Sequence, residues 1–172
     1  GNRGGKSSFM AVALALCWLQ RGGMGAEFAL IGPEIKQAHL LKKKLFEGEQ
    51  TGRWNPPIID RRLWTRIPEK ERQDDQFCYM VDGSLFWLTH SKSAGHLKGR
   101  AWVRAAFTEA SECPYPEVHT VARARLVDAG GQLWLDSTPG KDQSHWLKTG
   151  VVDVALEERA RAQRGDTAAS TT

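Results

Sequence analysis

The sequence has few cysteines and no apolar run long enough to cross a membrane. Its three cysteines, Cys17, Cys78 and Cys113, lie far apart and form no Cys-x-x-Cys pair. Scattered thiols of this kind favour an intracellular protein with reduced cysteines over a disulfide scaffold. A zinc site on Cys113 and His119 would lack a second ligand pair at metal spacing. The longest apolar run, 9–19, is shorter than the roughly 20 residues that span a bilayer, so we expect no membrane association.

The excess of positive over negative charge is also small. The chain has 24 Lys and Arg residues against 20 Asp and Glu, which gives a net charge of +4. This mild excess permits an anionic partner without requiring one. With 172 residues, of which 41% are hydrophobic and 26% charged, the chain has the composition of one ordinary globular domain. That composition excludes a disordered, collagen-like or coiled-coil chain.

Apolar segments of helix type and strand type alternate along most of the sequence. The patterns predict helices over 7–20, 34–46, 91–98 and 117–128, and strands over 27–31, 77–81, 85–89, 102–107 and 132–136. Asp82-Gly83-Ser84 predicts a hairpin turn. The helix over 7–20 is apolar almost all round and is expected to be buried. Few polar residues interrupt 102–107 and 133–135, apart from Arg104, so both are expected to be interior strands. The alternation predicts an α/β fold with a parallel or mixed sheet covered by helices.

Gly4-Gly5-Lys6-Ser7, followed by an apolar helix, is the core of a phosphate-binding loop. The full pattern is G-x-x-x-x-G-K-[ST], and its first glycine would precede Gly1. The glycines let backbone N–H groups converge on phosphate oxygens, at which the helix also directs its positive end. Lys6 is expected to reach the β- and γ-phosphates of ATP, and the Ser7 hydroxyl to hold Mg²⁺. Ser8 joins the predicted nucleotide site, and the alternative is a glycine-rich basic arm before an ordinary helix.

Two strand ends carry further candidates. A P-loop ATPase usually has Asp and then Glu after a buried strand, where this chain has Thr108 and Glu109. Glu109 fits the residue that activates water. Thr108 stands in the position of the metal-associated Asp but cannot supply its charge. Ser137 and Thr138 follow the strand over 132–136, where they could bond the γ-phosphate or the attacking water. The alternatives are a strand-capping Glu109 and a plain Ser-Thr-Pro turn.

Taken in order, these segments resemble the ATPase domain of the tailed-phage terminase large subunit, the DNA-packaging motor. The resemblance covers residues 1–150. Gly1–Ser7 resembles that family's P-loop, which has an early arginine matched by Arg3. Thr108-Glu109-Ala110 stands where the family has Asp-Glu-Ala. Further matching segments are Phe28–Lys36, Asp82–Ser84, Ser91–Arg100 and, for the coupling motif, Leu135–Trp146.

The resemblance implies a P-loop NTPase-like α/β fold with a mainly parallel sheet, whose first strand is missing before Gly1. Residues 151–172 are expected to form a C-terminal helix and a flexible tail. The family's nuclease domain has no counterpart after residue 150.

The implied function is ATP hydrolysis, with Mg²⁺, that drives double-stranded DNA into a viral procapsid in the host cytoplasm. The expected partners are DNA, the portal protein, the small terminase subunit and further copies in a ring. Arg3 would stabilise charge on the γ-phosphate, with Glu109 as the second catalytic residue. Candidates for contacts with DNA phosphates are the lysines Lys42, Lys43, Lys44, Lys92 and Lys98. A solvated helix face explains the triple lysine equally well.

Two alternatives from other classes remain. A small P-loop kinase would need a lid of clustered arginines, for which Arg61, Arg62, Arg66 and Arg72 are candidates. A catalytically inactive remnant with a DNA-binding or assembly role is favoured by Thr108 and by the missing strand. Trp54, Trp64 and Trp87 could stack on bases or adenine, although packing in the core or the hairpin is preferred.

Overall fold

The structure is a computed structural model in which one twisted sheet organises the chain. It describes residues 4–23, 25–66, 76–91, 100–113, 116–138 and 146–164. The chain divides into two compact units, Gly1–Ser137 and Thr138–Thr172. The predicted helix over 91–98 lies, except for Ser91, outside the described residues, as does the tail from residue 165. In the second unit, η6 (Lys148–Val152) leads into helix α4 (Asp153–Gln163).

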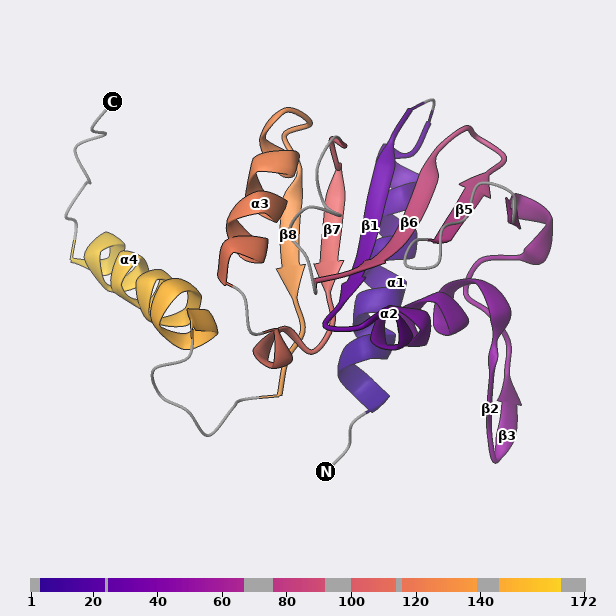
Figure 1. The fold of residues 1–172 in the computed structure, drawn as a ribbon, viewed down its shortest axis with the longest axis horizontal. Helices are drawn as coiled ribbons and strands as arrows, with labels where there is room; N and C mark the ends of the chain where they lie inside the picture. The colour runs from indigo at the N-terminus through magenta and orange to yellow at the C-terminus, as the bar shows by residue number, and fades with distance from the viewer. Residues whose placement is uncertain are drawn as a thin grey trace. The chain divides into compact units, whose positions relative to one another are not determined.

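The first unit is built on a six-stranded sheet in the order β4-β5-β6-β1-β7-β8 (Figure 1). Its strands are β1 (Glu27–Gly32), β4 (Trp64–Arg66), β5 (Gln76–Met80), β6 (Leu85–His90), β7 (Arg104–Phe107) and β8 (Gln132–Leu135). β6, β1, β7 and β8 are parallel, whereas β4 and β5 are antiparallel to their neighbours. The predicted mixed, mainly parallel α/β sheet is confirmed. A separate hairpin pairs β2 (Glu49–Thr51) with β3 (Arg53–Asn55).

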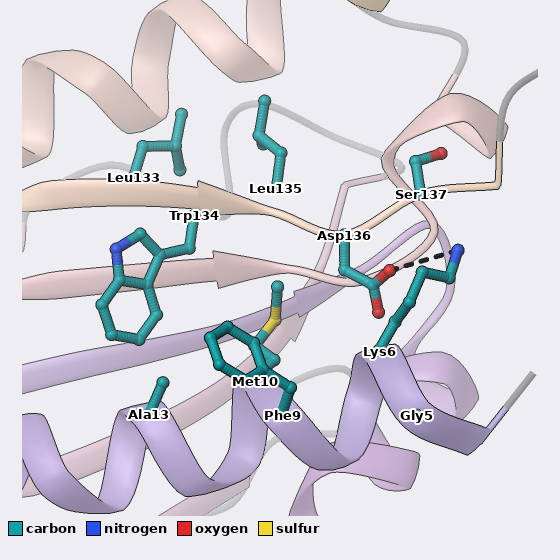
Figure 2. A pocket seen from close by; sticks show the side chains of 10 residues that line it. All are labelled: Gly5, Lys6, Phe9, Met10, Ala13, Leu133, Trp134, Leu135, Asp136 and Ser137. Carbon is teal, nitrogen blue, oxygen red and sulfur yellow. Dashed lines mark ion pairs between the residues drawn. The ribbon is translucent and has the colours of Figure 1, made fainter.

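Helices cover both faces of this sheet because side chains alternate across it. Phe28, Leu30 and Phe86 face helix α1 (Gly4–Arg21) and form one core with its Leu14 and Trp18. Helix α3 (Pro116–Val127) contacts β7 and β8 from the opposite face. Figure 2 shows this alternation on β8, where Trp134 points toward α1 and Leu133 points away from it. Helix α2 (Ile35–Lys42) and the following π-helical turn η1 (Lys43–Glu47) pack against α1.

Two expectations about burial are wrong. Helix α1 is not buried all round: Phe9 is 76% exposed and Leu19 is 69% exposed. Only one side of a helix can pack on a sheet, and an all-apolar composition does not say which side that is. The segment 133–135 is not an interior strand, because β8 ends the sheet and its residues are only half-buried. Among the described residues, no strand precedes α1 and only β7 pairs with β8.

The hairpin turn between β5 and β6 is the brace that fixes the C-terminal end of α1. Its Asp82 carboxylate accepts hydrogen bonds from the Ser84 backbone N–H at 2.9 Å and from Trp18 Nε1 at 2.9 Å. The Ser84 hydroxyl also donates to it. Burial alone would raise the pKa of Asp82, but these hydrogen bonds from Ser84 and Trp18 hold that pKa below its usual value. The predicted Asp-Gly hairpin is therefore confirmed, and it is tied to the helix that carries Lys6 and Ser7.

Replacing this carboxylate tests the brace. We expect Asp82→Ala to lower the free energy of unfolding at pH 7 by roughly 1–3 kcal/mol, because the Trp18 and Ser84 donors lose a charged acceptor. Since the folded-state pKa is lowered, this stabilisation is present above the unfolded-state pKa of about 4 and is lost as the pH falls through the folded-state value. Urea unfolding from pH 7 to pH 3 should show the deficit shrinking with acid. A constant deficit, or an equal one in the exposed Asp128→Ala, would contradict this account.

Candidate functional site

The first turn of α1 contains the glycine-rich motif. Gly4, Gly5, Lys6, Ser7 and Ser8 all belong to the helix, which begins at Gly4 rather than near Ser7 as expected. Glycine adopts helical and loop dihedrals alike, so the motif alone does not fix where the helix starts. The first four N–H groups of a helix have no partner within it, and their positive ends attract anions. Arg3 lies outside the described residues.

A buried carboxylate, Asp136, meets this turn from the end of β8. Lys6 Nζ lies 3.3 Å from Asp136 Oδ1, and the Ser7 hydroxyl donates to Asp136 Oδ2 at 3.3 Å. The Asp136 side chain is 5% exposed, whereas that of Lys6 is 44% exposed. Figure 2 shows the carboxylate directed toward Lys6 and the N-terminal turn of α1. The arrangement therefore places a cation, a hydroxyl and a carboxylate at the carboxyl edge of the parallel sheet.

Sequence reasoning missed Asp136. The sequence pattern predicts Ser137 and Thr138, the hydroxyl residues that follow it, as the binding residues at this strand end. The available signal was a carboxylate at the end of a parallel strand, where ligands of such sheets bind.

The end of β7 is tied to the end of β8. The Asp136 N–H donates to the Phe107 carbonyl at 2.7 Å, and the Ala110 N–H donates to the Asp136 carbonyl at 2.9 Å. The Ser111 N–H donates to the Ser137 hydroxyl at 2.8 Å. The 3₁₀ turn η5 (Ala110–Glu112) is thus joined to the segment after β8. Of the two predicted hydroxyl residues, Ser137 lies at this junction, and Thr138 is an exposed residue of the second unit.

Thr108 and Glu109 follow β7 in different environments. Thr108 is 1% exposed, and its N–H donates to the Ile31 carbonyl at 2.9 Å. Glu109 is half-buried and has φ 52° and ψ 46°, the left-handed region that non-glycine residues avoid. It is the one non-glycine residue with positive φ in the part of the chain that the structure describes. Strained backbone of this kind often marks a functional position.

The strain at Glu109 can be measured by substitution. We expect Glu109→Gly to be more stable than Glu109→Ala by roughly 0.5–1 kcal/mol, because glycine removes the left-handed penalty while raising the entropy of the unfolded chain. Urea unfolding of both variants gives the difference. The matched pair Glu112→Gly and Glu112→Ala, at an exposed position whose φ is not positive, should show the reverse order. Equal behaviour at the two positions would show that residue 109 carries no strain.

A pocket of about 1010 Å³ lies between α1 and β8. Its polar end is formed by Lys6, Asp136 and Ser137 (Figure 2). The remaining lining comes from Gly5, Phe9, Met10, Ala13, Leu133, Trp134 and Leu135. Trp134 is held by the buried guanidinium of Arg104, whose Cζ lies 4.5 Å from the centroid of the indole ring. The pocket therefore combines one charged end with a larger apolar wall.

Several predicted binding residues have other roles. Lys42 was expected to be exposed, but its side chain is 6% exposed and pairs with Glu47 at 2.9 Å. It lies on the side of α2 that packs inward. Lys44 is 18% exposed and pairs with Glu49 at 2.7 Å. Lys43 is exposed as expected. Lys92 and Lys98 lie outside the described residues.

The arginines and tryptophans of the alternative hypotheses make local contacts. Arg62 pairs with Asp60 at 2.9 Å, and the Arg62 hydrogen bonds lower the Asp60 pKa to about 2. Arg61 stacks 4.3 Å from the Trp64 ring centroid. Trp64 packs against Phe46, and Trp87 against Phe77 and Trp102, so the preferred core and hairpin packing of these two tryptophans is confirmed. Trp54 is 57% exposed. Nothing is described of the Arg66 side chain or of Arg72.

The remaining expectations concern the cysteines, a metal site and a membrane span. None of the three cysteines forms a disulfide, and Cys113 is buried. The side chain of His119 is not among those described. Within the described ranges no group of three metal-ligating side chains occurs, and no helix there is long and apolar enough to cross a membrane.

The mixed α/β sheet, with a pocket beside the end of β8, is similar to the sheets of several solved structures. The large terminase of a thermophilic bacteriophage in complex with ATP-γ-S has a TM-score of 0.63 and 18% identity, over 91% of this chain and 35% of that one. The ADP complex of the same phage protein gives 0.61 and 16%, over 91% and 36%. The large terminase ATPase domain of Thermus phage P74-26 gives 0.50 and 18%, over 81% and 57%.

These similarities show that the chain has the fold of a phage large terminase ATPase domain, which confirms the resemblance inferred from the sequence at the level of fold. The chain spans about a third of the length of the terminase that was solved with ADP and with ATP-γ-S. No protein-family model matches the sequence. No curated protein matches it either.

Proposed function

We propose that this chain is a terminase-like ATPase module, over residues 1–150, that hydrolyses ATP with Mg²⁺. The observation that carries the proposal is the meeting of Lys6 and Ser7 with Asp136 at the carboxyl edge of a terminase-type sheet. The neighbours with this fold were crystallised with ADP and with ATP-γ-S, which supports a nucleotide as the ligand.

The residues present fit a magnesium nucleotide. The Asp136 carboxylate and the Ser7 hydroxyl are hard oxygen groups of the kind that Mg²⁺ prefers. Lys6 and the backbone N–H groups of the first turn of α1 suit phosphate oxygens. When bound, the ion neutralises charge on the β- and γ-phosphates and so favours phosphoryl transfer. The turn and the strand end therefore offer oxygen groups for the ion and donors for the phosphates close to one another.

Each group of the chain has a separate task in this proposal. The Lys6 side chain is half-exposed and flexible, so its ammonium group leaves the Asp136 carboxylate and binds the phosphates. Glu109 orients and deprotonates the attacking water; its carboxylate makes no hydrogen bond or ion pair with the described residues and so is available to a water molecule. Ser137, hydrogen-bonded to Ser111, carries a change at the phosphate to η5. By resemblance, Arg3, Gly4, Gly5, Ser8 and Thr108 also belong to the proposed site.

Hydrolysis would be tested with the full chain. We expect Lys6→Ala to abolish binding of ATP, because it removes the positive charge at the phosphates. Glu109→Gln should leave ATP binding intact and lower turnover by about 10²–10⁴-fold, the usual effect of losing a general base. Titration calorimetry and phosphate release give the two quantities.

The control for that experiment is Lys36→Ala, which removes an exposed lysine paired with Glu34 and should change neither quantity. If the wild-type chain shows no ATP turnover and Lys6→Ala changes nothing measurable, the chain is an inactive remnant. That result would overturn the proposed activity.

We further propose that hydrolysis drives double-stranded DNA into a viral procapsid, with portal protein, small terminase subunit and a ring of copies as partners. The support is the terminase fold of the neighbours. DNA contacts would be to phosphates, and Lys43 is the described candidate that is exposed.

DNA should therefore stimulate ATP turnover, and stimulation should fall as salt rises because counterions are released on binding. We expect Lys43→Glu to weaken DNA binding. The slope of the logarithm of the binding constant against the logarithm of the salt concentration should fall by about one unit, the amount for one phosphate contact. DNA titrations between about 50 and 200 mM salt measure both. Phosphoryl transfer to a small acceptor without any response to DNA would instead identify a kinase.

A further inference from the structure

The chain lacks the acidic residue that P-loop ATPases usually have after the strand equivalent to β7. Thr108 stands there, and a neutral hydroxyl cannot match the charge of a carboxylate. An acidic residue, Asp136, stands at the same level one strand away. The last registered pair between β7 and β8 is Phe107 with Leu135, so Thr108 and Asp136 follow at the same level. Adjacent strands are about 4.8 Å apart, which is within reach of a single side chain.

The alternation of side chains along a strand assigns both residues to the same face of the sheet. Ala106 and Trp134 belong to or pack on the core beneath α1, and Thr108 and Asp136 come two residues later, directly after β7 and β8. The backbone of Asp136 is fixed at this level by its hydrogen bonds to Phe107 and Ala110. The carboxylate therefore starts from a rigid position, beside the site that an aspartate at 108 would occupy and on the side that faces Ser7.

The buried carboxylate of Asp136 depends on Lys6 for its charge balance. Asp136 is more than nine-tenths buried, and such a group is costly unless its charge is balanced. Its Oδ1 accepts no hydrogen bond among the described residues, although Lys6 Nζ lies 3.3 Å away. In the proposed function the phosphates engage Lys6. Asp136 would then be left buried next to a polyanion with Ser7 as its described partner, unless a second cation replaces Lys6.

We propose that Asp136 supplies the magnesium-associated carboxylate of this nucleotide site in place of residue 108. The assignment rests on the proposed nucleotide-binding function and goes beyond it by naming the residue. Ser7 and Asp136, already hydrogen-bonded, form the protein side of the metal site. Lys6 balances Asp136 when no nucleotide is bound, so nucleotide binding without a divalent cation must break an ion pair and bring phosphate against a carboxylate.

The test is the effect of Mg²⁺ on ADP affinity, measured by titration calorimetry on the full chain. We expect Mg²⁺ to tighten ADP binding at least about tenfold in the wild type, a ratio that corresponds to about 1.4 kcal/mol. In Asp136→Asn the ratio should fall to about twofold or less, while ADP binding without Mg²⁺ becomes tighter, because Lys6 is released and the repelling charge is gone. A purely structural role for Asp136 would weaken both affinities together. The control Asp128→Asn, at an exposed position, should behave as the wild type.

A second variant tests the position rather than the charge alone. Thr108→Asp added to Asp136→Asn should restore the magnesium effect, because the acid returns at the same level on the neighbouring strand. Circular dichroism shows whether the double variant folds. If the double variant does not fold, the result for Asp136→Asn decides the question. If Mg²⁺ tightens ADP binding to Asp136→Asn as much as to the wild type, the role of Asp136 is overturned and the proposed function is not. Absence of ADP binding to the wild type, with and without Mg²⁺, would overturn the proposed function as well.

Discussion

The parallel register of β1, β7 and β8 is the constraint on which the site depends. Because these strands run the same way and are paired level with one another, their carboxyl ends meet at one edge. Thr108, Glu109, Asp136 and Ser137 therefore come together although two of them are separated from the others by a helix and a turn. The first turn of α1 packs over the same edge and adds Lys6 and Ser7. A slip of one residue in β8 would turn Asp136 away from α1.

The placement of α1 depends in turn on contacts distant from the site. Its inner face shares a core with β1 and β6, and its Trp18 is hydrogen-bonded to the hairpin turn at Asp82 and Ser84. The helix is therefore held near its C-terminal end by hydrogen bonds and along its length by packing, which leaves the N-terminal turn to the Asp136 contact. A long rigid helix carries this orientation to Lys6 and Ser7.

The sequence predicts the features whose signals are local. The glycine-rich motif before α1, the Asp-Gly turn at 82–84 and the alternation of helix and strand are read from neighbouring residues, and the terminase-type fold follows from their order. Burial and partners are not local. Lys42 is buried because of how α2 packs, and β8 lies at an edge because of the order of strands. Asp136 and Ser7 are 129 positions apart, so no spacing in the sequence indicates their contact.

The pairing of Lys6 with Asp136 explains how this edge of the sheet can hold a buried carboxylate. A buried carboxylate with no cation beside it would destabilise the fold. Paired, each balances the other at 3.3 Å. The half-exposed lysine keeps this pairing reversible, since its ammonium can leave the carboxylate without unfolding the helix. Under the proposed function, the same pair would make nucleotide binding depend on a divalent cation.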